Sequence, residues 1–126
     1  PLLVAVTILT SLAEEDLARV GFSGTVLENV ERLARLARAS GMDGVVCSAQ
    51  EAPILRKAAG SDFILVTPGI RLKSDRKDDQ SRIVTPVEAV RLGADYLVIG
   101  RSITQAHDPA ATLASIRESL GEGATA

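Results

Sequence analysis

Four short apolar runs recur along the chain, and a segment with helical periodicity follows each of them. The runs cover residues 2–9, 44–48, 63–67 and 96–100. They are aliphatic and rich in β-branched residues, with little alternation between apolar and polar positions. Such runs are typical of parallel strands that are buried on both faces. The pattern therefore predicts four buried strands, the first of them included.

Capping signals indicate where the intervening helices begin. A helical stripe of apolar residues begins near Val26 and ends at Gly41, where a glycine can stop a helix. Asp108 followed by Pro109 predicts the start of a last helix that reaches about Leu120. Three further starts have the spacing of a capping box, namely Ser11 with Glu14, Ser48 with Glu51, and Thr85 with Glu88.

A short repeat marks three of the junctions between helix and strand. The pattern Gly-x-Asp followed by an apolar run occurs at 41–46, 60–66 and 93–99. The glycine can end a helix in left-handed geometry, and the aspartate suits the turn. Repeated alternation of strand and helix predicts an α/β protein with a parallel sheet. Both a doubly wound open sheet and half of a (β/α)8 TIM barrel fit, and four units favour the half barrel.

Composition places the chain among globular proteins. Of 126 residues, 46% are hydrophobic and only 2% aromatic, so the core must be aliphatic. The pattern predicts one domain over residues 1–120 and a disordered tail over 121–126. The chain opens with Pro1 rather than Met, which suggests a fragment or a processed chain.

Charge and cysteine content narrow the function classes. A net charge of −2 argues against a nucleic-acid partner and against binding to an anionic membrane. No apolar run reaches the roughly 18 residues of a membrane span. The single cysteine, Cys47, cannot form an internal disulfide, which favours a cytoplasmic location. On its apolar strand it is expected to be a small core residue.

A long polar excursion follows the third run. Residues 65–86 pass from an apolar strand through a Pro-Gly turn into ten strongly polar residues, 73–82. Most connections in compact domains have about 4–6 residues, so a mere connection would be shorter. In βα repeats, the loops after the strands lie on the face where ligands bind. The excursion is therefore a candidate lid over a ligand.

The residues at this face suit a phosphate group. Gly69 and Gly100 let backbone N–H groups approach an anion, and a short helical turn can begin after Gly100. Arg71 and Arg101 each offer a planar donor fork, and Gln80 can donate its amide. A plainer interpretation remains open. A Gly-Arg pair at a strand end is common, and the charges of residues 73–79 nearly cancel, as in an ordinary solvated loop.

Other catalytic constellations lack support in the sequence. His107 is the only histidine, lies beside a predicted helix cap, and is expected at the surface. One histidine and one cysteine give little basis for a zinc site. Ser11, Ser48 and Ser102 have no base at a recognisable spacing, so a serine triad is not indicated.

The chain resembles the orotidine 5′-phosphate decarboxylase family, and its bacterial group in particular, up to about Leu120. The matching stretches are VTILTS (6–11), DGVVCSAQEA (43–52), LVTPGIR (65–71), DQSRI and TP within 79–86, and YLVIGRSITQAHDP (96–109). The resemblance implies a (β/α)8 barrel, of which this chain supplies strands five to eight. It also implies a homodimer with active sites near the subunit interface. The expected reaction converts orotidine monophosphate to UMP and CO2 without a metal or organic cofactor.

The resemblance assigns roles to five residues. Thr10 corresponds to the residue that hydrogen-bonds the pyrimidine. The substrate and phosphate contacts correspond to Arg71, Gln80, Gly100 and Arg101. The catalytic Asp-x-Lys-x-x-Asp motif of the family occurs nowhere in the chain. The resemblance thus implies no catalytic residue here, a missing N-terminal half of the barrel as partner, and a fragment that is inactive alone.

Three alternatives stay open at this point. A sister decarboxylase acting on a sugar phosphate such as a 3-keto acid would keep the Gly-Arg pair, but it is not expected to carry TPGIR with the DQ pair. The chain could also be a non-catalytic phosphate-binding half barrel that folds by self-association. A general flavin- or nucleotide-binding barrel is the third, and no further feature of the sequence favours it.

Overall fold

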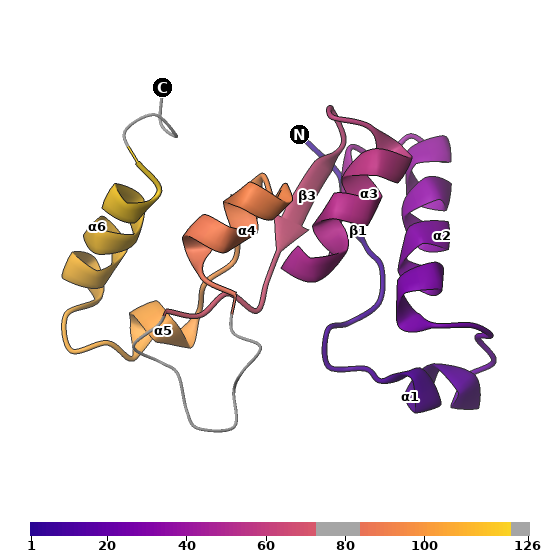
Figure 1. Cartoon of the computed structure of the whole chain (residues 1–126), viewed down its shortest axis with the longest axis horizontal. Helices are drawn as coiled ribbons and strands as arrows, with labels where there is room; N and C mark the ends of the chain where they lie inside the picture. Colours follow the sequence, from indigo (N-terminus) through magenta and orange to yellow (C-terminus); the bar gives the residue numbers. More distant parts are fainter. Residues whose placement is uncertain (73–83, 122–126) are drawn as a thin grey trace.

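The computed structural model describes residues 1–72 and 84–121 (Figure 1). Its strands are β1 (Val4–Val6), β2 (Gly44–Val46), β3 (Ile64–Thr67) and β4 (Tyr96–Leu97). Its helices are α1 (Glu14–Arg19), α2 (Val26–Ala39), the 3-10 turn η1 (Ala49–Glu51), α3 (Ala52–Ala59), α4 (Pro86–Leu92), α5 (Arg101–Thr104) and α6 (Pro109–Ser119). The predicted alternation of strands and helices is confirmed. The predicted tail falls outside the described residues from 122 onward.

The four strands form one parallel sheet in the order β1-β2-β3-β4. Val45 lies opposite both Ala5 and Leu65, which fixes the register of the first three strands. A doubly wound sheet reverses its strand order at a switch point, whereas a barrel adds each strand beside the last. The sequential order is therefore that of a barrel, and the predicted α/β class with four βα units is confirmed.

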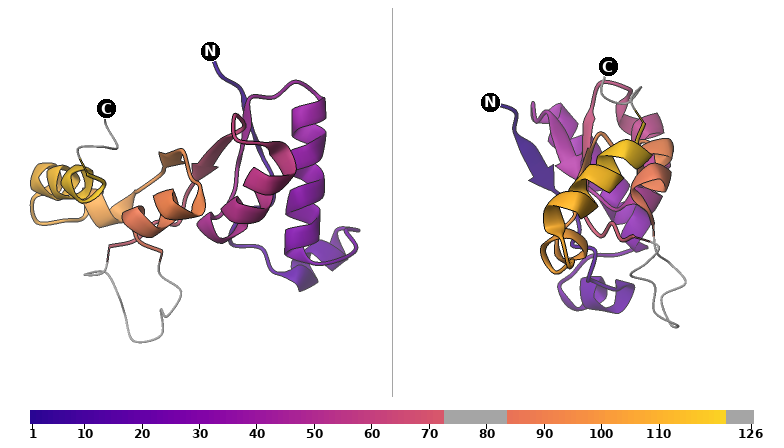
Figure 2. Two further views of the ribbon diagram at one scale, coloured as in Figure 1. Left: turned by 45° about the horizontal axis from the view of Figure 1, so that its top comes forward. Right: turned by 90° about the vertical axis from the view of Figure 1, so that its left-hand side faces the viewer.

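The helices cover one face of the sheet, as the two views of Figure 2 show. Val45 and Leu65 point to this side, are fully buried, and pack in one cluster with Leu55 of α3 and Val30 of α2. Cys47 belongs to the same cluster with 1% of its surface exposed. The predicted aliphatic core and the predicted core position of Cys47 are both confirmed.

The opposite face of the sheet is open. Val6 of β1 is 59% exposed and Tyr96 of β4 is 56% exposed, although they share a row with Val46 and Val66. The expectation that the first strand is buried on both faces is therefore wrong. It is an edge strand, and the described helices cover only the side to which Ala5 points.

The repeated glycines adopt the predicted left-handed geometry. Gly41, Gly60 and Gly93 have φ angles of 88°, 97° and 120°. Each follows the end of a helix, where a side chain would be strained. The three junctions thus share a glycine with a positive φ angle directly after the helix.

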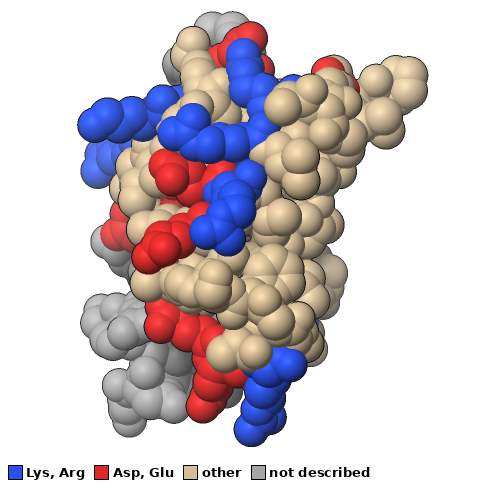
Figure 3. All heavy atoms as spheres, turned by 90° about the vertical axis from the view of Figure 1, so that its right-hand side faces the viewer, with Lys and Arg blue, Asp and Glu red and all other residues tan. Residues whose placement is uncertain are grey.

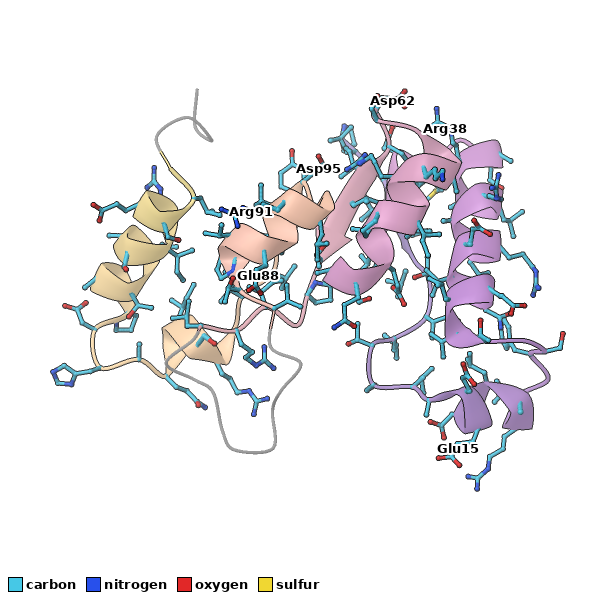
Figure 4. The ribbon with its side chains drawn as sticks, in the orientation of Figure 1. Glu15, Arg38, Asp62, Glu88, Arg91 and Asp95 are labelled. Carbon is cyan, nitrogen blue, oxygen red and sulfur yellow. The ribbon has the colours of Figure 1, made fainter. Side chains whose placement is uncertain are left out.

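The aspartates of the repeat do more than suit a turn. The Asp43 carboxylate accepts a hydrogen bond of 2.7 Å from the N–H of Leu3, on the strand before its own. Asp95 accepts one of 2.9 Å from the N–H of Leu65 in the same way. Asp62 instead forms an ion pair with Arg38 at 3.2 Å. Figure 4 places Asp62 and Asp95 near the same end of the molecule, where the strands begin. Two of the three repeats thus tie neighbouring strands together at their amino ends.

The capping predictions are confirmed except at α1. Thr85 and Glu88 cap each other: the N–H of Glu88 donates to the Thr85 hydroxyl at 3.3 Å, and the N–H of Thr85 donates to the Glu88 carboxylate at 3.0 Å. Ser11 is not a cap, because α1 begins after Ala13, whose N–H donates to the Asp16 carboxylate. Two further predicted caps make their bonds, Ser48 with Glu51 and Asp108 with Ala111.

Candidate functional site

The carboxyl ends of β3 and β4 place two arginines at one edge of the sheet. Beyond β3 the chain passes through Gly69 to Arg71, and beyond β4 it passes through Gly100 to Arg101. The two strands are direct neighbours, with Thr67 opposite Leu97. Because parallel strands end at the same edge, the structure brings Arg71 and the Gly100-Arg101 pair to adjacent positions there.

The backbone at Arg71 is held in place at the base of the polar excursion. Ile70 forms an isolated parallel bridge with Val84, and the N–H of Arg71 donates to the carbonyl of Val84 at 3.1 Å. Ile70 is fully buried. The side chain of Arg71 is half-buried, and one of its Nη groups donates to the Ile70 carbonyl at 3.0 Å. The sequence analysis did not predict the contact between Arg71 and Val84. The available signal was the return of apolar residues at the end of the polar excursion.

Gly100 and Arg101 open the short helix α5. The carbonyl of Gly100 accepts hydrogen bonds from the N–H groups of Ile103 and Thr104, at 2.9 and 3.0 Å. The predicted helical turn after Gly100 is thus confirmed. Arg101 is its first residue and is exposed. Gly100 has no atom within 4 Å of the position of an added Cβ, so the space beside its Cα is open.

The other two predicted contacts lie elsewhere. Thr10 follows β1 and is exposed in the connection to α1. It belongs to the same edge of the sheet as Arg71, but β2 lies between their strands. Gln80 lies outside the described residues. The structure therefore groups Arg71 with Gly100 and Arg101, and it places Thr10 on the far side of β2.

Cys47, directly after β2, has an unreactive thiol. Burial raises the pKa of its thiol to about 12, and the negative charge of Glu51 contributes in the same direction. The Thr67 side chain acts in the opposite direction and lowers this pKa only in part. The thiol is accordingly neutral near neutral pH and is a poor nucleophile there.

A cleft of about 580 Å³ lies between α4 and α6. Leu72 and Thr85 line it on one side, and Ser115 and Ile116 of α6 line it on the other. It belongs to the helical layer, and none of the described predicted contacts lines it. The cleft is therefore separate from the edge that carries the arginines.

Neither a metal site nor a membrane-spanning helix is found among the described residues. Within 1–72 and 84–121, no three His, Cys, Asp or Glu side chains lie close enough together to hold a metal ion. No helix in that part of the chain is both long and apolar enough to cross a membrane. On the face seen in Figure 3, Lys and Arg are interspersed with Asp and Glu, so this face is not a basic patch.

Known proteins are similar to this chain in sequence and in fold. The family described as Orotidine 5′-phosphate decarboxylase / HUMPS family matches residues 1–116. The chain belongs to this family. A curated relative, orotidine 5′-phosphate decarboxylase of Hydrogenovibrio crunogenus, is 60% identical over 121 residues. That match covers 96% of the chain and 51% of the relative.

Solved structures give the same picture of a half-length match. Orotidine 5′-phosphate decarboxylase from Lactobacillus acidophilus is 38% identical with a TM-score of 0.80, and the match covers 96% of this chain and 50% of that one. The enzyme from Pyrococcus horikoshii OT3, at 18% identity and a TM-score of 0.62, shows the fold alone over 94% of this chain and 49% of that one. The chain thus spans about half the length of the relatives it matches.

Proposed function

We propose that the chain is the phosphate-binding half of an orotidine 5′-phosphate decarboxylase, which converts orotidine monophosphate to UMP and CO2. The observation that supports this is that Arg71 and the Gly100-Arg101 pair follow the ends of two adjacent parallel strands in a chain that belongs to the family. The domain is proposed to cover residues 1–120.

The arginines suit a phosphate dianion better than a neutral ligand. A guanidinium group offers donors in a fixed planar fork, which matches phosphate oxygens and keeps its charge at all relevant pH values. Arg101 is exposed and can reach a ligand at the edge. At Gly100 the space beside Cα is open, so an anion can approach the backbone without meeting a Cβ. Gln80 is proposed as a further phosphate contact and Thr10 as the pyrimidine contact.

The chemical step needs groups that this chain does not carry. Loss of CO2 breaks the bond between C6 and the carboxyl carbon and leaves the electron pair on C6. A proton must then reach C6, and in the family a lysine of the Asp-x-Lys-x-x-Asp motif supplies it. This motif is absent from the sequence. The missing N-terminal half is therefore proposed as the partner that supplies the catalytic residues.

The phosphate is remote from C6, which makes its binding useful to catalysis. Contacts to a remote group can drive closure and desolvation of the site. Charged groups that are already in position stabilise the developing carbanion most strongly in a site from which water is excluded. In this division of labour the chain holds the substrate and the other half performs the proton transfer. No metal or organic cofactor is proposed, and the complete enzyme is proposed to be a cytoplasmic homodimer.

Reconstitution tests the proposal. The chain is mixed with a separately produced N-terminal half of the Hydrogenovibrio crunogenus relative, and UMP formation is measured. We expect no activity from either half alone and activity from the mixture. A 3-keto sugar acid phosphate serves as the competing substrate, because a sister decarboxylase acting on such a compound is one of the alternatives left open by the sequence. The proposal would be contradicted if the mixture acted on the 3-keto compound but not on orotidine monophosphate. It would also be contradicted if the two halves formed a stable complex without any activity.

A further inference from the structure

Within residues 1–72 and 84–121, no element covers the edges of the two outer strands of the sheet. The β1 edge, residues 2–7, has no charged side chain, and neither has the β4 edge over residues 96–100. Asp95, just before β4, is engaged by Arg56 at 2.7 Å. Soluble proteins usually protect such edges with lysine, proline or a covering element, because open edges recruit further strands.

The backbone of β1 is oriented for such pairing. Leu3 faces β2, since its carbonyl accepts from the N–H of Asp43 and its own N–H donates to the Asp43 carboxylate. Backbone groups alternate in direction along a strand, so those of Val4 and Val6 point to the open edge. They provide donors and acceptors for one further parallel strand.

The uncovered face beside these edges is apolar. Val6 and Tyr96 stand at its two ends, 59% and 56% exposed, and Val98 is 50% exposed. Val46 and Val66 lie between the two ends in the same row. A contiguous apolar face of this kind marks an interaction surface.

Symmetry identifies a body that fits this face. A half-turn about an axis parallel to the strands keeps every strand direction and brings the β4 edge of one copy beside the β1 edge of the other. The same half-turn creates the second seam, so four strands in sequential order become eight in a closed ring. Helix α6 lies beyond α4, at the end of the molecule opposite α2, and its Leu113 is 46% exposed (Figure 1). In the closed ring this helix covers the seam.

We infer that, without an N-terminal half, a second copy of this chain covers the open face and closes a symmetric eight-stranded barrel through two β4–β1 seams. The inference concerns the 126-residue chain itself and does not depend on the proposed enzyme activity. Two properties are required together. The chain must form dimers and no larger oligomers, and the dimer must depend on the strand edges and on the open face.

Sedimentation of the chain and of two lysine variants tests this inference. The Val6→Lys variant places a charge on the open face at the β1 edge, once in each copy. The Val90→Lys variant is the matched control, because Val90 lies on α4, between η1 and α6 of the same copy and away from both seams, and is 42% exposed. We expect the unmodified chain and the control to be dimers. We expect the Val6→Lys dimer to dissociate at least about tenfold more readily, since each copy loses burial of a valine and gains a buried charge.

Three results would overturn the inference. One is a folded monomer of the unmodified chain at micromolar concentrations that nevertheless binds a separate N-terminal half. Another is a series of larger oligomers, which would mean that the edges pair without closing. The third is equal dimerisation of Val6→Lys and Val90→Lys. If Val6→Lys loses its circular dichroism signal, Tyr96→Lys at the other edge replaces it, with the same expectation.

Discussion

Removing Arg56 should destabilise the fold more than removing any exposed arginine. This side chain leaves α3 and is 23% exposed. One Nη group donates to the Gly93 carbonyl at 2.6 Å and to the Asp95 carboxylate at 2.7 Å. The other donates to three carbonyls in the connection from α3 to β3, those of Gly60, Ser61 and Phe63. One guanidinium therefore ties together the connections that lead into β3 and β4.

The size of the effect follows from what the substitution leaves behind. Arg56→Ala removes charge-assisted hydrogen bonds worth about 1.5–3 kcal/mol each at full burial. Partial exposure lets water replace some of them, and Asp95 is 41% exposed. The carboxylate also keeps its bond from the Leu65 N–H. We therefore expect a loss of about 2–4 kcal/mol in the free energy of unfolding rather than the sum of the bonds.

Urea unfolding followed by circular dichroism measures this loss, at one fixed protein concentration because association affects apparent stability. Arg35→Ala is the control. Arg35 is 60% exposed and its nearest carboxylate, on Glu31, is 3.7 Å away, so its loss should cost less than about 0.5 kcal/mol. Arg56→Lys should recover less than half of the loss, because a single ammonium cannot reach both connections. If Arg56→Ala and Arg35→Ala had the same urea unfolding midpoint, the conclusion that Arg56 ties the two connections together would be wrong.

Four further outcomes are expected. Gly44→Ala should lower the unfolding midpoint strongly in the same urea assay, because an added Cβ would lie 2.2 Å from the backbone oxygen of Ile64. Gly100→Ala should not, because the space at that position is open. Equal midpoints for the two variants would contradict this. Cys47 should resist iodoacetamide in the folded chain at pH 9, its ordinary pKa. Because folding raises this pKa, its contribution to stability is present below pH 9 and is lost as the pH rises toward 12, which a comparison of unfolding with Cys47→Ala would detect. Arg101→Ala in the reconstituted enzyme should reduce kcat/KM by a factor equivalent to about 2–4 kcal/mol, and much less for a substrate without phosphate; equal losses would refute the phosphate contact.

The candidate site was only partly accessible from the sequence. Gly100 and Arg101 could be located because a glycine and an arginine directly follow an apolar run, and such a run predicts a strand end. That Arg71 comes from the neighbouring strand, and that Val84 holds its backbone, depends on contacts between residues distant in the chain. Such contacts leave no local signal. The role of Thr10 came from resemblance alone and stays a prediction.

Local signals in the sequence predict the types of element and most of their ends. Periodicity, capping residues and left-handed glycines act within a few residues, as at Thr85 and Gly93. That the strands follow one another in order, which distinguishes the barrel from the doubly wound sheet, is visible only in the folded chain. The fold also makes β1 an edge strand, although its apolar sequence suits a buried one. The physical reason is that hydrophobic pattern records which side chains favour burial, whereas strand order and the presence of a covering layer depend on contacts across the whole fold.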